Sequence, residues 1–228
     1  MKMEADGEIY RAMLEQNSKS QKIGGAIDLM LAKKHDPETL DPKGWLMSEK
    51  LDGVRCYWTG TLMFSRNGNP FTPPEWFVEK LPEGLALDGE LWTKRDDFQK
   101  TVSIVRRQDK NEEWKKVTFM VFDAPLIKKP FKARLNILKE KISKLNCDWV
   151  KLCEQTVVKS QEHLNEEMVK VLEMGGEGLM IKDPSSKYEH RRSDKLLKIK
   201  KFDDAEAKVT GWEYGTGKNE EVMGAVHV

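Results

Sequence analysis

The chain has 228 residues, of which 39% are hydrophobic and 34% charged, and its 39 basic and 38 acidic residues leave a net charge of +1. This length suffices for one large domain or two small ones with a real core, and the charge balance excludes a polycation. No apolar run approaches the ~20 residues of a membrane-spanning helix, and the acidic N-terminus lacks the apolar segment of a secretory signal. We therefore expect an intracellular protein, cytoplasmic or nuclear, that acts without a membrane.

Residues 1–25 are polar and predict an N-terminal extension with one weak helix at 8–16. A domain of the α+β class is expected over 26–203. Runs of β-forming residues bounded by turn residues predict its strands, at 45–50, 54–58, 61–64, 86–92, 117–122, 149–152, 179–181 and 196–199. The first three are separated by Asp-Gly and Thr-Gly turns at 52–53 and 59–60, and they predict a meander of antiparallel strands.

Apolar residues spaced three or four apart predict the helices of this domain. They are expected at 74–80, at 96–107, after Pro130 as far as 145, and from Ser160 to the Gly-Gly pair at 175–176. Beyond residue 203 the pattern changes, because alternation at 207–212 and 223–228 flanks a Gly-Thr-Gly-Lys turn at 215–218. We interpret 204–228 as the incomplete start of a second β domain.

Cysteine and histidine usage argues against disulfides and zinc. Cys56, Cys147 and Cys153 are odd in number and contain no C-x-x-C pair, so reduced thiols are expected. The four histidines are scattered along the sequence, which makes a zinc site improbable.

The positive charge is concentrated near the end of the first domain. Between 187 and 201, two acidic residues accompany seven basic ones: Lys187, Arg191, Arg192, Lys195, Lys198, Lys200 and Lys201. A basic stripe on a near-neutral protein is typical of contact with a phosphate backbone. The alternative is a solvated charged face without a partner.

The segment KLDGVR at 50–55 supplies a candidate nucleophile. Lys50 stands at the end of a predicted strand, directly before a turn. Its amine can attack phosphorus only when neutral, so its pKa must fall below the usual ~10.4, and burial or neighbouring cations would lower it. The motif is short, and the alternative is an exposed lysine beside an Asp-Gly turn.

Two further segments place unusual residues inside apolar strands. In LDGEL at 87–91, Glu90 should face a cleft that holds a hydroxyl, a cation or a metal, because buried acids need partners. The alternative is an edge-strand acid paired with Arg or Lys. In FMVFD at 119–123, Phe122 is either a core residue or a flat ring that stacks on a purine.

The last two segments supply a carboxylate and two lysines. In EGLMIK at 177–182, Glu177 suits a hard cation such as Mg²⁺. In LLKIK at 196–200, the two-residue period places Lys198 and Lys200 on one face, where they could grip a triphosphate. A solvated edge strand is the alternative. All five segments lie on strands or at strand ends, so one cleft could gather them.

Together these segments resemble the ordered motifs of the covalent nucleotidyltransferases, which include DNA ligases, RNA ligases and mRNA capping enzymes. SRNG at 65–68 adds a sixth motif in the expected order. The sequence is most similar to the minimal bacterial ATP-dependent DNA ligases of the ligase E type, from about residue 27 to 228. The segments SEKLDGVRCYW, NPFTPPEWF, SIVRR and RRSDKLLKIKKFDDAEAKVTG carry this closer resemblance.

The resemblance implies a nucleotidyltransferase (ATP-grasp-like ligase) domain of antiparallel sheets flanked by helices, followed by the start of an OB-fold domain. It implies a monomeric DNA ligase of DNA repair and replication, with ATP, Mg²⁺ or Mn²⁺, and nicked double-stranded DNA as its ligands. Lys50 would form lysyl-AMP and pass AMP to the 5′-phosphate of the nick. The other roles implied are nucleotide contacts for Arg55, Arg66, Lys198 and Lys200, ribose or metal contacts for Glu90, metal binding for Glu177, adenine stacking for Phe122, and DNA contacts for Arg66, Arg191 and Arg192.

Two features depart from the family pattern. Ligase E proteins are often exported, and no export signal is expected here. The family's last motif, in the OB-fold domain, orients the pyrophosphate leaving group and has no counterpart in 204–228, which leaves self-adenylation and DNA encirclement open. An RNA ligase, a capping guanylyltransferase and a non-catalytic nucleotide- or DNA-binding module therefore remain alternative interpretations.

Overall fold

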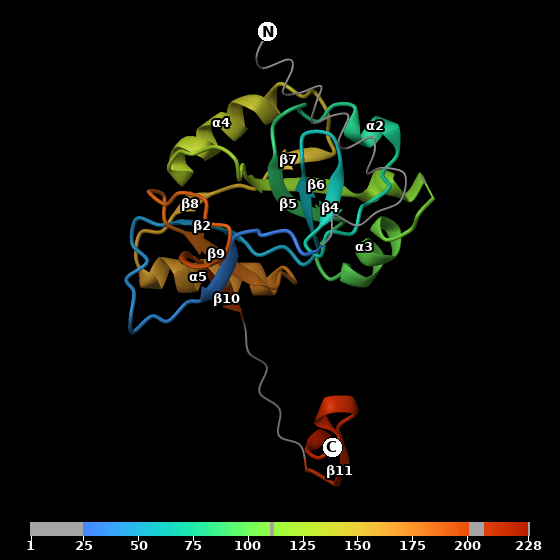
Figure 1. Ribbon diagram of the computed structural model, residues 1–228. Coiled ribbons are helices and arrows are strands. Elements are labelled where there is room, and N and C mark those ends of the chain that lie inside the picture. The colour runs from blue at the N-terminus through green and yellow to red at the C-terminus, as the bar shows by residue number, and fades with distance from the viewer. Residues whose placement is uncertain (1–24, 110–111, 201–207, 228) are drawn as a thin grey trace.

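The computed structural model describes residues 25–109, 112–200 and 208–227 (Figure 1). The predicted helix at 8–16, most of the predicted extension 1–25 and the predicted boundary near 203 lie outside these residues. The strands are β1 (Leu31–Lys34), β2 (Leu46–Glu49), β3 (Val54–Trp58), β4 (Met63–Ser65), β5 (Leu87–Trp92), β6 (Thr118–Asp123), β7 (Val150–Leu152), β8 (Thr156–Val157), β9 (Gly178–Lys182), β10 (Arg192–Lys200), β11 (Gly211–Tyr214) and β12 (Met223–His227). The helices are α2 (Glu75–Val78), α3 (Phe98–Val105), α4 (Phe131–Ser143) and α5 (Gln161–Glu173), with short 3-10 turns at Glu112–Lys116 and Gly217–Asn219.

Two five-stranded sheets form the main body, which confirms the α+β class. Sheet A has the order β1-β10-β9-β2-β8, and sheet B has the order β4-β3-β5-β6-β7. Most neighbouring strands are antiparallel, but β1 pairs with β10 and β6 pairs with β7 in parallel. Strands β2 and β3 follow each other in sequence yet lie in different sheets, so the chain crosses between the sheets at 50–53.

That crossing corrects the predicted meander of three strands. Only β3 and β4 form the expected hairpin, with Cys56 opposite Ser65 and Trp58 opposite Met63, while β2 pairs with β8 and β9. The Asp-Gly turn is a crossover between the sheets, and it requires glycine at 53, where an added Cβ would come within 2.4 Å of the Leu91 carbonyl oxygen. The sequence pattern identified the strands, and it contained no signal for which sheet each one joins.

Each sheet has its own hydrophobic core on its outer side. Alternate residues of sheet B pack against α2, α3 and α4, and the fully buried members of this core include Leu91, Phe119 and Trp114. In α4, which follows Pro130, Phe131, Arg134 and Leu138 are buried at helical spacing, and Ile142 and Leu145 are partly buried against the same core. Figure 1 shows α4 over sheet B and α5 on the far side of sheet A.

The core of sheet A is smaller and is closed by α5. Ser160 caps this helix by accepting a hydrogen bond from the His163 amide at 3.2 Å. Leu164 and Val171 of α5 pack against residues that alternate along β9 and β10, among them Ile181 and Leu197. The opposite faces of both sheets are therefore left to line the space between them.

Residues 208–227 form a separate antiparallel hairpin of β11 and β12. Strand β12 lies where alternation predicted a strand, whereas β11 overlaps the predicted strand 207–212 only at 211–212. Among the residues that the structure describes, no helix combines the length and the hydrophobicity needed to cross a bilayer.

Candidate active site

A cavity of about 360 Å³ lies between the two sheets. It is lined by the inward-facing residues of strands whose alternate residues fill the cores, together with Met30 and the loop after β7. Its lining includes these predicted site residues: Lys50, Arg55, Arg66, Glu90, Phe122, Arg192, Lys198 and Lys200. Pockets of this size, apolar with a few polar groups, are typical small-molecule sites.

Lys50 follows β2, and its amide donates a hydrogen bond to the carbonyl oxygen of Gly178 at 2.8 Å. Its side chain is 23% exposed and its Nζ is ion-paired with Glu177, which also pairs with Nζ of Lys200. Burial lowers the pKa of Lys50 below its ordinary value, against the opposing effect of the carboxylates of Glu90 and Asp52. The pKa of Lys200 is also lowered, first by burial and then by Lys50.

Glu90 lies opposite Arg55 in the β3–β5 ladder and faces the cavity. Burial raises its pKa to about 7, although Arg55 and Lys50 act in the opposite direction. Within the described residues its carboxylate makes no hydrogen bond or ion pair. The sequence interpretation of a paired edge-strand acid therefore does not fit, and the carboxylate is available to a ligand.

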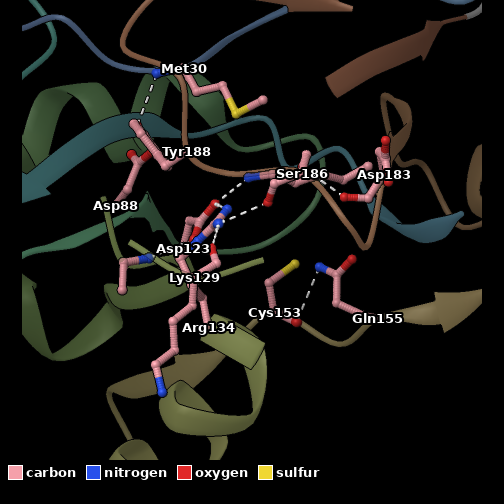
Figure 2. A network of polar contacts seen from close by, with 12 residues as sticks. Met30, Asp88, Asp123, Lys129, Arg134, Cys153, Gln155, Asp183, Ser186 and Tyr188 are labelled. Atoms are coloured by element: carbon pink, nitrogen blue, oxygen red, sulfur yellow. Dashed lines mark hydrogen bonds and ion pairs between the residues drawn. The ribbon is translucent and has the colours of Figure 1, made fainter. Parts of the chain in front are cut away.

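Arg55 is fixed by a buried carboxylate on the neighbouring strand. Its Nε and Nη2 donate to the two oxygens of Asp88 at 2.6 and 2.7 Å, and the pKa of Arg55 is raised because Asp88 outweighs the effect of burial. The phenol of Tyr188 also donates to Asp88, at 2.6 Å, and accepts from the Met30 amide (Figure 2). Arg55 lies over the ring of Phe122, 4.7 Å from its centroid, so this ring is a cavity wall and not core.

A second buried network lies beside the cavity. Arg134 donates to both oxygens of Asp123 at 2.6 and 2.9 Å, and both side chains are fully buried. Lys182 lines the cavity and is ion-paired with the same carboxylate. Burial raises the pKa of Asp123, but Lys182 and Arg134 more than compensate and lower it overall. Arg134 also donates to the Ser186 carbonyl at 3.0 Å, which ties the β9–β10 loop to α4 (Figure 2).

Of the remaining predicted residues, two lysines face the cavity, Glu177 does not line it, and the three arginines are exposed. Lys198 and Lys200 face the cavity, while Leu197 and Ile199 pack in the sheet A core, as the period-two alternation predicts. Glu177 reaches the cavity only through its two lysine partners. The exposed basic residues are Arg66, Arg191, which is paired with Glu189 at 3.0 Å, and Arg192, which donates to the Ala32 carbonyl at 2.5 Å.

Sequence reasoning missed the residues that hold the predicted ones in place. Asp88, Tyr188 and Lys182 were not selected, although Asp88 stands in LDGEL and Lys182 ends EGLMIK. The available signal was the presence of a second acid two residues before Glu90 in an apolar strand, since a buried acid needs partners. Tyr188 carried no such signal, because its partner lies 100 positions away.

The carboxylates of this site suit a hard divalent cation only with help from a ligand. No group of three or more His, Cys, Asp or Glu side chains that could hold a metal occurs in the part of the chain that the structure describes. Glu90 offers an unpaired carboxylate at the cavity, and Glu177 offers a second one that is paired with Lys50 and Lys200. Mg²⁺ is often held by one or two carboxylates together with substrate phosphates and water, so these residues fit such an ion in the presence of a nucleotide.

A family model, a curated relative and solved structures all match this chain and agree on one family. The family model described as "ATP dependent DNA ligase domain" matches residues 29–200. A DNA ligase of Haemophilus influenzae is 35% identical over 199 residues, which span 87% of this chain and 73% of that protein. A solved structure from a study of Lig E DNA ligases has a TM-score of 0.81 at 38% identity, covering 87% of this chain and 78% of the other. A Chlorella virus DNA ligase-adenylate has a TM-score of 0.65 at 29% identity, covering 87% and 79%.

Proposed function

This chain belongs to the ATP-dependent DNA ligase family, and we propose that Lys50 is the residue on which it forms lysyl-AMP. As a member of that family it is an adenylation domain of a DNA ligase. The observation that supports Lys50 is its position: a half-buried amine with a lowered pKa, at a cavity whose lining also includes the cations Arg55, Lys198 and Lys200.

In the first step, the Nζ of Lys50 attacks the α-phosphorus of ATP. A nitrogen–phosphorus bond forms, the bond to the bridging oxygen breaks, pyrophosphate leaves, and one amine proton passes to a cavity carboxylate or to water. Lys198 and Lys200 stabilise the negative charge that grows on the leaving group, which is the main contribution of protein to such transfers. Because Glu177 pairs with Lys50 and favours its charged form, this contact must be released before attack.

Nucleotide binding follows from the cavity walls. Phe122 offers a flat ring for adenine. Arg55 lies over this ring and is held by Asp88, which also accepts from Tyr188, so Arg55 contributes fixed positive charge. Glu90 is placed to receive the ribose or a divalent cation. Such a cation, held by Glu90 and Glu177, would neutralise charge on the phosphates.

We further propose that the acceptor is nicked double-stranded DNA and that the protein acts as a monomer. AMP passes from Lys50 to the 5′-phosphate, the 3′-hydroxyl then attacks that phosphorus, and AMP departs as the phosphodiester forms. The exposed Arg66, Arg191 and Arg192 would contact the DNA backbone. We retain an intracellular location as part of the proposal, on the basis of the reduced cysteines.

The test is intact-protein mass spectrometry after incubation with ATP and Mg²⁺. We expect a gain of one AMP in the wild type and in Lys43→Arg, which alters an exposed lysine, and no gain in Lys50→Arg. Modification of the Lys50 variant would reject Lys50 as the nucleophile. A protein that stays unmodified with ATP yet seals a pre-adenylylated nick would assign the later steps alone to this chain.

The same assay separates the alternative interpretations. Adduct formation with GTP instead of ATP would favour a capping guanylyltransferase, and joining of RNA ends in preference to DNA ends would favour an RNA ligase. A protein that binds nucleotide or nicked DNA without any covalent step would be a binding module.

A further inference from the structure

The turn that follows β5 is fixed in an unusual conformation. Asp96 has a φ of 53°, a left-handed backbone conformation that residues other than glycine rarely adopt. Thr93 donates from its hydroxyl to Asp97 at 2.9 Å and contacts the hydroxyl of Thr101 in α3 at 2.7 Å. These bonds hold the turn on α3, so the direction in which Arg95 leaves it is specified by the structure.

Arg95 reaches from this turn in sheet B to Glu49 in strand β2 of sheet A. Its Nε donates to Oε1 of Glu49 at 2.8 Å and its Nη2 donates to Oε2 at 2.7 Å. The two side chains are 34% and 20% exposed. A paired contact of this kind fixes both the distance and the relative angle of its partners, so it constrains the separation of the two sheets at this point.

The carboxylate of Glu49 has little room to move away from this contact. It packs against the turn before β9, where a Cβ added at Gly176 would lie 2.9 Å from Oε1 of Glu49 and 2.5 Å from Cγ1 of Val171. The next residue in that turn is Glu177, which pairs with Lys50 and Lys200. Glu49 is therefore held between Arg95 and the Glu177 turn, and it is joined to Lys50 by one peptide bond.

We propose that Glu49 and Arg95 are positioning residues that set the place of the Lys50 amine by holding the two sheets at a fixed separation. This inference rests on the proposed role of Lys50. Glu49 lines the cavity and Arg95 does not, so the influence of Arg95 on the reaction passes through Glu49 and β2. A residue that acts in this way changes the rate of the chemical step more than the binding of ATP.

The experiment is a double-mutant cycle of Glu49→Gln, Arg95→Gln and the double variant, followed by the rate of lysyl-AMP formation over a range of ATP concentrations. We expect each single variant to lower the rate at saturating ATP by about 5- to 50-fold with less than about a threefold change in the half-saturating concentration. The double variant should be no slower than the slower single variant. Arg95→Lys keeps the charge and loses the two-point guanidinium contact, so its rate of lysyl-AMP formation should lie between those of the wild type and Arg95→Gln.

The matched control is the exposed pair Arg107–Asp109, which also joins an arginine fork to a carboxylate but lies within one segment. Arg107→Gln should leave both kinetic parameters unchanged. Independent, multiplicative effects of the two single variants would overturn the proposal, as would an effect confined to ATP binding or one that follows the loss of thermal stability across all the variants.

A separate measurement keeps the two proposals distinct. If the wild type forms no AMP adduct at Lys50, the proposed function fails, and the positioning role is judged on the reaction of the Lys50 amine with an amine-directed reagent. That rate must change by the same factor in Arg95→Gln and in the double variant. An unchanged rate in Arg95→Gln would reject the positioning role.

Discussion

Lys50 and Glu177 are ion-paired although 127 positions separate them in the chain. A carboxylate in contact with an amine favours its charged form. Replacing Glu177 by Gln should therefore raise the neutral fraction of Lys50 in the free protein. We expect faster reaction of Lys50 with an amine-directed reagent at pH 8, measured by peptide mass spectrometry, together with slower formation of lysyl-AMP if Glu177 holds a metal. An unchanged reagent rate would show that this contact does not control the amine.

The position of Phe122 in the cavity wall predicts a role in binding and not in chemistry. Stacking of a base on an aromatic ring is worth about 1 to 3 kcal/mol by alanine substitution. Phe122→Ala should therefore raise the half-saturating concentration of ATP by roughly 5- to 150-fold at a similar maximal rate, while Phe122→Tyr should stay within about threefold of the wild type. A fall in the maximal rate alone would argue against stacking.

The pair of Asp123 and Arg134 predicts a strong dependence of stability on one carboxylate. Breaking a buried pair costs about 3 to 5 kcal/mol, so Asp123→Asn should lower the free energy of unfolding in urea by that amount. Glu140→Gln, which breaks the exposed pair with Lys144, should change the free energy of unfolding far less, because solvent screens that pair. Because the folded-state pKa of Asp123 is lowered, its contribution is present above the unfolded pKa of about 3.9 and is lost as the pH falls through the folded value.

The raised pKa of Glu90 predicts that the free energy of unfolding depends on pH with the opposite sign. Its folded-state pKa is about 7, whereas an unfolded glutamate titrates near 4.3. Between these values the folded state keeps a proton that the unfolded state has lost, so stability falls as the pH rises. In metal-free buffer, the free energy of unfolding of Glu90→Gln relative to the wild type should increase by about 1 to 3 kcal/mol from pH 5 to pH 8. A difference that is constant with pH would contradict the raised pKa.

The exposed arginines at the start of β10 predict a salt-dependent contact with DNA. Each phosphate contact contributes about 0.9 to the slope of log affinity against log salt. Arg191→Ala and Arg192→Ala should each reduce that slope by about 1 for a nicked duplex, while Lys139→Ala on α4 should leave it unchanged. A slope that is the same in all three variants would place the DNA elsewhere.

The sequence predicted most of the strands of the two sheets, and the faces of the strand that ends at 200, because two-residue alternation depends only on local burial. This is why Lys198 and Lys200 were expected on one face, and why Glu90 was expected to face a cleft. The partition of β2 and β3 between different sheets was not predictable, since it depends on contacts with β9 and β5 that are distant in the chain. Strands β1 and β8 were missed, because four and two residues are too short to show a clear period.

The partners of the site residues were also beyond the sequence pattern. Lys50 could be selected from its motif, but its contact with Glu177 required the turn before β9 to be placed beside β2. The prediction that Arg55 contacts a ligand remains a prediction, and its bond to Asp88 shows that part of its hydrogen-bonding capacity is already used. The sequence did not show that Arg55 and Asp88 would lie on adjacent strands and be buried together.

The strands of sheet B occupy the continuous stretch 54–152, whereas sheet A combines β1 and β2 with strands that begin after residue 155. During synthesis on the ribosome, sheet B can therefore assemble while β2 still lacks both of its neighbours. The strand that leads to Lys50 becomes paired only when β8 and β9 emerge more than 100 residues later. In a nascent chain the strand before Lys50 thus gains its neighbours late, and a chain that stops before residue 177 lacks the ion pair between Lys50 and Glu177.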